Sequence, residues 1–195
     1  MKLLKQTFTD PILRSNNLRA IGIHAALSII GFFALVVFGV VGEVATDGAR
    51  WAGFAAMILP ITFGIPIYIY CGKKFMKATD ADLIVSVVWL TALTAIAGTL
   101  GAVRSLMLSV EHMLPFGVNV MGIENLILPV LVLNTLGLGI VVLFADFSGA
   151  LMVIVEPLAY LAATFIPPGL LALGLRLKMK RNAGEKSPKT LEQDA

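Results

Sequence analysis

Five polar residues in the second half of the chain carry side chains that could bind a small solute or transfer protons. They are Arg104, Glu111, His112, Asn134 and Glu156, and each lies within or beside a long apolar run. Ionisable groups in such runs are costly, and they usually face a bundle interior or a water-filled cavity. Two carboxylates with a histidine at that depth could relay protons or coordinate a cation. We predict a solute- or proton-binding site made from these five residues.

Signatures of enzymes and of metal sites are missing from the sequence. It contains no HExxH, GxSxG or GxGxxG pattern and no P-loop. The two histidines, His24 and His112, are far apart, and Cys71 is the single cysteine, so the spacing of a metal site is lacking as well. We therefore expect no enzymatic activity, no cofactor and no bound metal. His24 is expected to be a packed or interfacial histidine.

Composition predicts that the elements carrying these residues are membrane-spanning helices. Of the 195 residues, 58% are hydrophobic and only 14% are charged, whereas soluble domains carry about 25% charged residues. Several runs reach the roughly 20 apolar residues that cross a hydrocarbon layer of about 30 Å. The net charge is +3, and the basic residues flank the apolar runs. This placement indicates the lipid bilayer as their partner and argues against nucleic acid.

Hydropathy divides the chain into a polar N-terminal arm (1–19), a transmembrane helical bundle (20–175) and a basic tail (176–195), which is expected to be disordered. Within the bundle the apolar runs cover 20–42, 51–71, 83–102, 125–145 and 150–175. Asn16 and Asn17 are expected to cap the first of these helices. The last run would be roughly 39 Å long as one helix, so it must tilt, kink or break, and Pro167–Pro168 is a place where it would do so. Ala92, Ala95 and Gly98 would let another helix approach the third run closely.

Val103–Gly117 is the least apolar segment between these runs. Arg104, Ser109 and Glu111 fall on one arc of a helical wheel, and apolar side chains occupy the opposite arc, which is the pattern of a short amphipathic helix. Two placements satisfy that pattern. The segment can lie flat on the outer surface, or it can cross the membrane with its polar face turned into the bundle.

Lysine and arginine counts favour the crossing. The arm carries four of them, the loop 73–77 carries three and the tail carries six, which together make thirteen of the fifteen. All three segments can face the cytoplasm only if the number of crossings is even, and the obvious apolar runs number five. A crossing by Val103–Gly117 gives about six helices, with both termini cytoplasmic. Two alternatives stay open: five plain crossings, or a surface-lying Val103–Gly117 with the last run turning back at Pro167–Pro168.

Six crossings would bring the polar residues of the last three helices to similar depths. At 1.5 Å per residue, Glu156, Glu111 and Asn134 would lie about 10, 13 and 16 Å below the outer surface. The alternatives are structural: Glu156 can be a protonated acid bonded to a neighbouring helix, Arg104 and Glu111 can form a static ion pair, and Glu111 and His112 can face water.

These features predict a multi-pass protein of the plasma or inner membrane that transports a small solute or serves as a membrane subunit of a transporter. The alternative is an accessory, immunity or regulatory membrane protein that acts through helix–helix contacts. A membrane-protein partner or a homo-oligomer fits either interpretation. The solute itself is not indicated.

Overall fold

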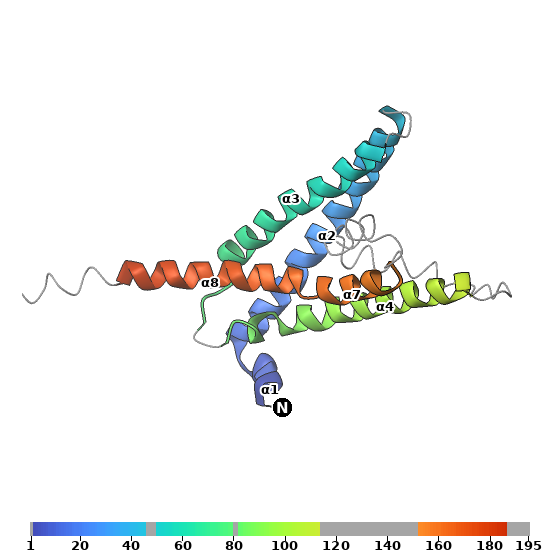
Figure 1. Cartoon of the computed structure of the whole chain (residues 1–195). Helices are drawn as coiled ribbons and strands as arrows, with labels where there is room; N and C mark the ends of the chain where they lie inside the picture. The colour runs from blue at the N-terminus through green and yellow to red at the C-terminus, as the bar shows by residue number, and fades with distance from the viewer. Residues whose placement is uncertain (1, 46–49, 80–81, 114–151, 187–195) are drawn as a thin grey trace, which may run out of the picture.

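The computed structural model of the chain describes residues 2–45, 50–79, 82–113 and 152–186 (Figure 1). Its elements are α1 (Lys2–Thr9), α2 (Pro11–Ala45), α3 (Arg50–Phe75), the short 3₁₀ helix η1 (Val85–Val87), α4 (Val88–Met113), α7 (Met152–Ala163) and α8 (Ile166–Lys186). No strand occurs within these ranges, and the expected all-helical class is confirmed. Three helical segments are long and apolar enough to cross a membrane: Pro11–Ala34, Val85–Met107 and Ile154–Gly184.

The helices pack in two pairs, and α8 connects them because it follows α7 and packs against α3. α2 lies beside α3, and α4 lies beside α7, while α7 and α8 follow one another almost in a line (Figure 1). α8 packs against the C-terminal part of α3, where Tyr68, Met76, Leu171 and Leu175 belong to one buried apolar cluster. The basic end of α8 and the α4–α7 pair therefore extend in opposite directions from the region where α2, α3 and α8 meet.

α2 begins earlier than the hydropathy indicated. The Asp10 carboxylate accepts hydrogen bonds from the backbone N–H groups of Ile12 (2.7 Å) and Leu13 (3.2 Å), so it caps the helix that starts at Pro11. The expectation that Asn16 and Asn17 cap the first apolar helix is wrong. Both residues lie inside α2, fully buried, and their side chains bind other segments of the chain.

The break between α7 and α8 confirms that the last apolar run does not form one unbroken helix. α7 ends at Ala163, and the N–H groups of Thr164 and Phe165 make short-range bonds of 3.3 and 3.2 Å to Leu161 and Ala162. The pyrrolidine nitrogens of Pro167 and Pro168 cannot donate, so helical hydrogen bonding stops before them and resumes after them. α8 then continues to Lys186, about three turns beyond the boundary at residue 175, so the first part of the basic tail is helical.

α4 also differs from its expected boundary. The sequence separated a span at 83–102 from an amphipathic segment at Val103–Gly117, but α4 runs without interruption from Val88 to Met113. Nothing between Val103 and Met113 breaks a helix, and the first proline after this stretch is Pro115. At 1.5 Å per residue α4 extends about 39 Å. Residues 103–113 therefore continue the preceding helix and do not form a separate helix that returns; residues 114–117 lie outside the described ranges.

Glycines allow α3 to approach α8 closely, and α4 to approach α7 closely. A Cβ on Gly72 would overlap the backbone of Leu171, and a Cβ on Gly174 would lie 2.8 Å from the backbone nitrogen of Lys73. Of the small residues predicted as a contact face on α4, Gly98 does meet α7, and Gly101 joins it, whereas Ala92 is exposed. Both crossings depend on the absence of a side chain at these positions.

Candidate functional site

The α4–α7 contact is built around the ring of Tyr160. This side chain is buried and lies against Gly98 and Gly101, where a Cβ on Gly101 would come within 2.7 Å of Tyr160 Cε1. One turn before this contact, the Thr94 hydroxyl donates a 2.7 Å hydrogen bond to the backbone oxygen of Thr164. The contact of Tyr160 with the two glycines fixes the position of α7 along α4. The Thr94 hydrogen bond fixes the same position.

This arrangement brings Arg104 and Glu156 to the same ring. Arg104 lies about one turn beyond Gly101 on α4, and Glu156 lies about one turn before Tyr160 on α7. Arg104 and Glu156 both lie close enough to the Tyr160 hydroxyl to interact with it electrostatically. The Arg104 Nε atom is buried and has no hydrogen-bond partner among the described groups. We call Arg104, Glu156 and Tyr160 the α4–α7 polar cluster.

Two of the five predicted site residues are thus brought together. Glu111 and His112 belong to the last turns of α4, about 10 to 12 Å along the helix axis from Arg104, and their side chains are not described. Asn134 lies outside the described ranges. Tyr160 was not among the predicted residues. Its spacing of four from Glu156 was the available signal, because residues four apart share one face of a helix.

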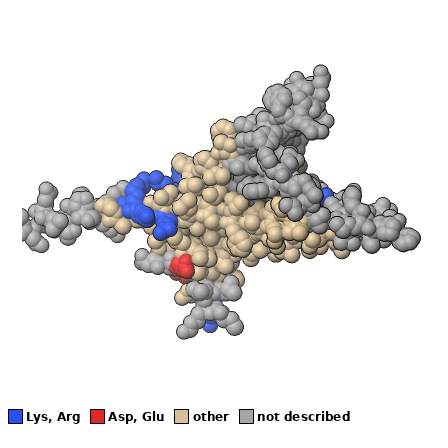
Figure 2. All heavy atoms as spheres, viewed as in Figure 1, with Lys and Arg blue, Asp and Glu red and all other residues tan. Residues whose placement is uncertain are grey.

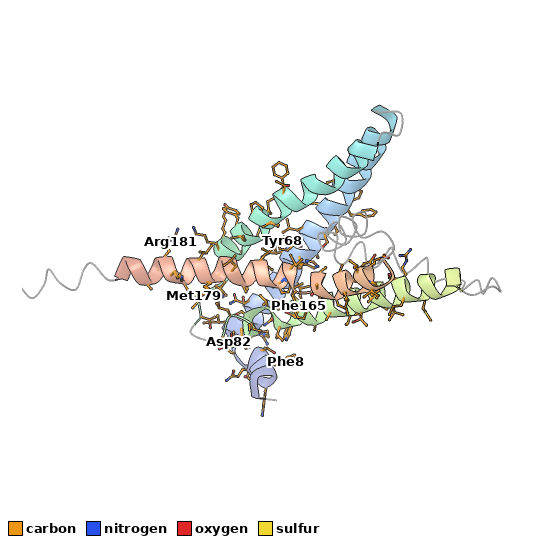
Figure 3. All side chains as sticks on the ribbon, viewed as in Figure 1. Phe8, Tyr68, Asp82, Phe165, Met179 and Arg181 are labelled. Carbon is orange, nitrogen blue, oxygen red and sulfur yellow. The ribbon has the colours of Figure 1, made fainter. Side chains whose placement is uncertain are left out.

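A second buried polar group joins α2 to α3 inside the bundle. His24 Nδ1 lies 2.7 Å from the Tyr68 hydroxyl, and Ser28, one turn further along α2, lies close to that hydroxyl. His24 and Tyr68 are 1% and 2% exposed, so both side chains are fully buried; Figure 3 labels Tyr68 in the region where α2, α3 and α8 meet. The expectation that His24 is a packed histidine is confirmed.

The C-terminal end of α3 is held by side chains from two other helices. Helices end with carbonyl groups that lack an intrahelical partner, and here three consecutive carbonyls receive one. Arg19 of α2 donates to the Phe75 oxygen, Lys178 of α8 donates to the Met76 oxygen at 2.7 Å, and Asn16 donates to the Lys77 oxygen at 2.9 Å. Residues from all three predicted basic segments therefore lie at one end of the molecule.

Hydrogen bonds at the same end of the molecule fix the position of the start of α4. The Asn17 amide donates to the Val85 oxygen at 2.9 Å, and its side-chain oxygen accepts from the Trp89 N–H at 2.9 Å. The Trp89 indole in turn donates to the Thr7 hydroxyl at 3.1 Å and lies against the Phe8 ring. α1, α2, η1 and α4 thus meet through Asn17 and Trp89. The roles of Asn16 and Asn17 were missed because hydropathy treats both as ordinary polar flanks.

Within the described part of the chain, no group of three or more histidine, cysteine, aspartate or glutamate residues could hold a metal ion. No family model, curated protein or solved structure matches the sequence.

Proposed function

We propose that this chain is a multi-pass protein of the cell membrane that binds a small polar solute at the α4–α7 polar cluster. It would act in transport of that solute, either as a carrier or as a membrane subunit of a larger transporter. The observation that carries the proposal is the placement of Arg104 and Glu156 beside Tyr160, with a buried guanidinium nitrogen that has no hydrogen-bond partner among the described residues. A buried unpaired donor is costly, and a solute with an acceptor group would remove that cost.

The position of the cluster along the helices supports this proposal. Arg104 lies about 22 Å along the axis from Trp89. Trp89 lies near the end of the molecule where the three basic segments meet, which we call the basic end. In a hydrocarbon layer of about 30 Å the cluster would lie in the half of the membrane opposite to the basic end. Glu156 is close to the start of the apolar segment Ile154–Gly184. A solute could therefore reach the cluster from the outside without crossing most of the bilayer.

The proposed topology places the basic end in the cytoplasm. α2, α3, α4 and the α7–α8 pair would each cross once, since lysine and arginine favour the cytoplasmic side. α4 leads away from the basic end and α7–α8 leads back to it, so residues 113 and 152 lie at the same end. Both chain ends would then be cytoplasmic if the chain crosses the membrane an even number of times between residues 113 and 152.

The three groups of the cluster suit a solute with both an acceptor and a donor. Arg104 can donate to a carboxylate or carbonyl group, Glu156 can accept from an ammonium or amide group, and the Tyr160 hydroxyl can do either. Glu156 can also take up a proton when a cationic group leaves. Solute exchange would then be linked to proton movement at that carboxyl group, which would give a carrier its energy coupling.

The experiment is a thermal-shift screen of the purified protein against amino acids, small carboxylic acids, nucleobases and vitamins, followed by uptake of each hit into proteoliposomes. We expect a hit whose shift and uptake are lost in Glu156→Gln and in Arg104→Gln. The exposed Arg14→Gln removes the same charge at the other end of the protein and serves as the matched control. The proposal fails if every hit binds the two cluster variants as tightly as the unmodified chain.

The alternative, an accessory or regulatory protein that acts through helix contacts, is favoured by a different observation. Tyr160 and Thr164 fill the space beside Gly98 and Gly101, so α4 and α7 are in direct contact there. Ala92 is exposed on the same helix and offers a small-residue surface to a partner. Under this alternative Ala92→Phe would disrupt a complex, while Glu156→Gln would leave function intact.

A further inference from the structure

One face of α3 carries an exposed apolar stripe that ends in a lysine. Phe63, Ile67 and Tyr70 are 61%, 42% and 55% exposed, and Lys74 follows them at the same helical spacing. Steps of four, three and four residues keep all four side chains on one side of a helix. Gly72 and Tyr68, which pack against α8 and α2, lie on the other side. The stripe therefore faces away from the described bundle.

The two lysines at the end of this stripe are not needed to bind the carbonyl groups at the end of α3. Lys74 Nζ lies 5.4 Å from the Tyr70 ring centroid and 5.5 Å from that of Phe75, and Lys73 beside it is exposed. The terminal carbonyls of α3 are already bound by Arg19 and Lys178. No described carboxylate forms a salt bridge with Lys73 or Lys74. Figure 2 shows lysine and arginine side chains gathered over this end of α8 and α3, beside a surface of uncharged residues.

From this arrangement we infer that the stripe and its two lysines bind an anionic phospholipid of the cytoplasmic leaflet. The phosphate group would lie at Lys73 and Lys74, and one acyl chain would lie along Tyr70, Ile67 and Phe63. The distance supports a lipid: eleven residues separate Lys74 from Phe63, which is about 16 Å along the axis, and half of a hydrocarbon core of about 30 Å is about 15 Å. Basic clusters next to cytoplasmic helix ends are typical anionic-lipid sites.

This lipid site does not depend on solute binding at the α4–α7 polar cluster. The test compares the full chain in phosphatidylcholine nanodiscs with and without phosphatidylglycerol, using native mass spectrometry to count retained lipids and thermal unfolding to follow stabilisation. We expect retention of phosphatidylglycerol over phosphatidylcholine, and a loss of that preference by roughly 10- to 30-fold in Lys73→Gln/Lys74→Gln. Lys5→Gln/Arg14→Gln removes the same number of exposed charges elsewhere and should keep the preference.

Two further arms make the outcome decisive. Lys73→Arg/Lys74→Arg keeps the charge and should keep the lipid, which separates lost binding from lost folding. Inorganic phosphate and glycerol 3-phosphate should neither stabilise the protein nor displace the lipid. Equal retention of phosphatidylglycerol by the glutamine variant and the unmodified chain would overturn the inference. Full replacement of the lipid effect by inorganic phosphate would overturn it too, because the site would then bind a free anion.

Discussion

The carboxamide of Asn16 and the backbone of Lys77 exchange two hydrogen bonds: Asn16 Nδ2 donates to the Lys77 oxygen at 2.9 Å, and the Lys77 N–H donates to Asn16 Oδ1 at 2.8 Å. A side-chain amide has the same donor and acceptor as a peptide group, so it can replace the backbone partner that a chain lacks after a helix ends. Asn16 is fully buried. The end of α3 is thereby tied to α2 through an interaction 61 residues apart in sequence.

Replacement of this amide should therefore be strongly destabilising. We expect Asn16→Ala to cost about 1 to 4 kcal/mol, because two partly buried backbone groups of Lys77 lose their partners, each at the lower part of the range of about 1 to 3 kcal/mol for a fully buried group. Ser15→Ala, at the neighbouring half-buried position, should change stability by less than about 0.5 kcal/mol. Unfolding in detergent, followed by circular dichroism, measures both. Equal stability of the two variants would show that Asn16 does not hold the end of α3.

The two glycines Gly72 and Gly22 should respond oppositely to alanine. A Cβ at Gly72 would overlap the Leu171 backbone, which cannot move without separating α3 from α8, so Gly72→Ala should lower stability by more than about 2 kcal/mol. Nothing lies within 4 Å of a Cβ at Gly22, and Gly22→Ala should be neutral or stabilise by up to about 1 kcal/mol. The same unfolding measurement tests both, and a stable Gly72→Ala protein would exclude the close crossing.

Lys178 and Lys180 provide a second matched pair. Lys178 donates to the Met76 oxygen, whereas Lys180 is exposed and makes no described hydrogen bond. Lys178→Met should cost about 1 to 2 kcal/mol, near the lower part of the range for hydrogen bonds to charged groups because the side chain is half-exposed. Lys180→Met should have little effect. If both variants unfolded at the same temperature as the unmodified chain, the hydrogen bond from Lys178 to Met76 would contribute nothing to stability.

The Tyr68 hydroxyl should matter for the α2–α3 pair. Tyr68→Phe leaves the buried His24 ring nitrogen without this partner, so we expect a loss of about 1 to 3 kcal/mol. Replacing both groups, in His24→Leu/Tyr68→Phe, should cost less than the sum of the two single changes, because both polar atoms of the 2.7 Å contact are then removed. A double-mutant cycle on thermal unfolding gives the coupling energy. Strict additivity would mean that the 2.7 Å contact contributes nothing.

The parts of the fold that were predictable are those that local sequence encodes. Apolar runs gave the helical class, and Pro167–Pro168 indicated the break that follows Ala163, because proline acts on its own backbone. The end of α4 was misplaced because the polar arc of residues 103–113 marks an amphipathic helix but does not say whether it continues the preceding one. The roles of Asn16, Asn17 and Gly101 were also hidden, since their partners Lys77, Val85 and Tyr160 are distant in sequence.

The predicted site was recovered unevenly for the same reason. Arg104 and Glu156 stood out as charges in apolar runs, and the structure brings both to Tyr160. Tyr160 gave no signal beyond its spacing of four from Glu156, because a tyrosine in an apolar helix is ordinary near a membrane interface. Its importance follows from the glycines opposite to it on α4, which only the pairing of α4 with α7 reveals.

Topology is the claim on which the functional account depends, and labelling of single cysteines in intact cells tests it most directly. In a Cys71→Ser background, a membrane-impermeant maleimide should label Met113→Cys from outside, and should label Lys77→Cys only after the membrane is opened. That result would place the basic end in the cytoplasm, with α4 crossing once toward the α4–α7 polar cluster. Labelling of both positions from the same side would contradict the account.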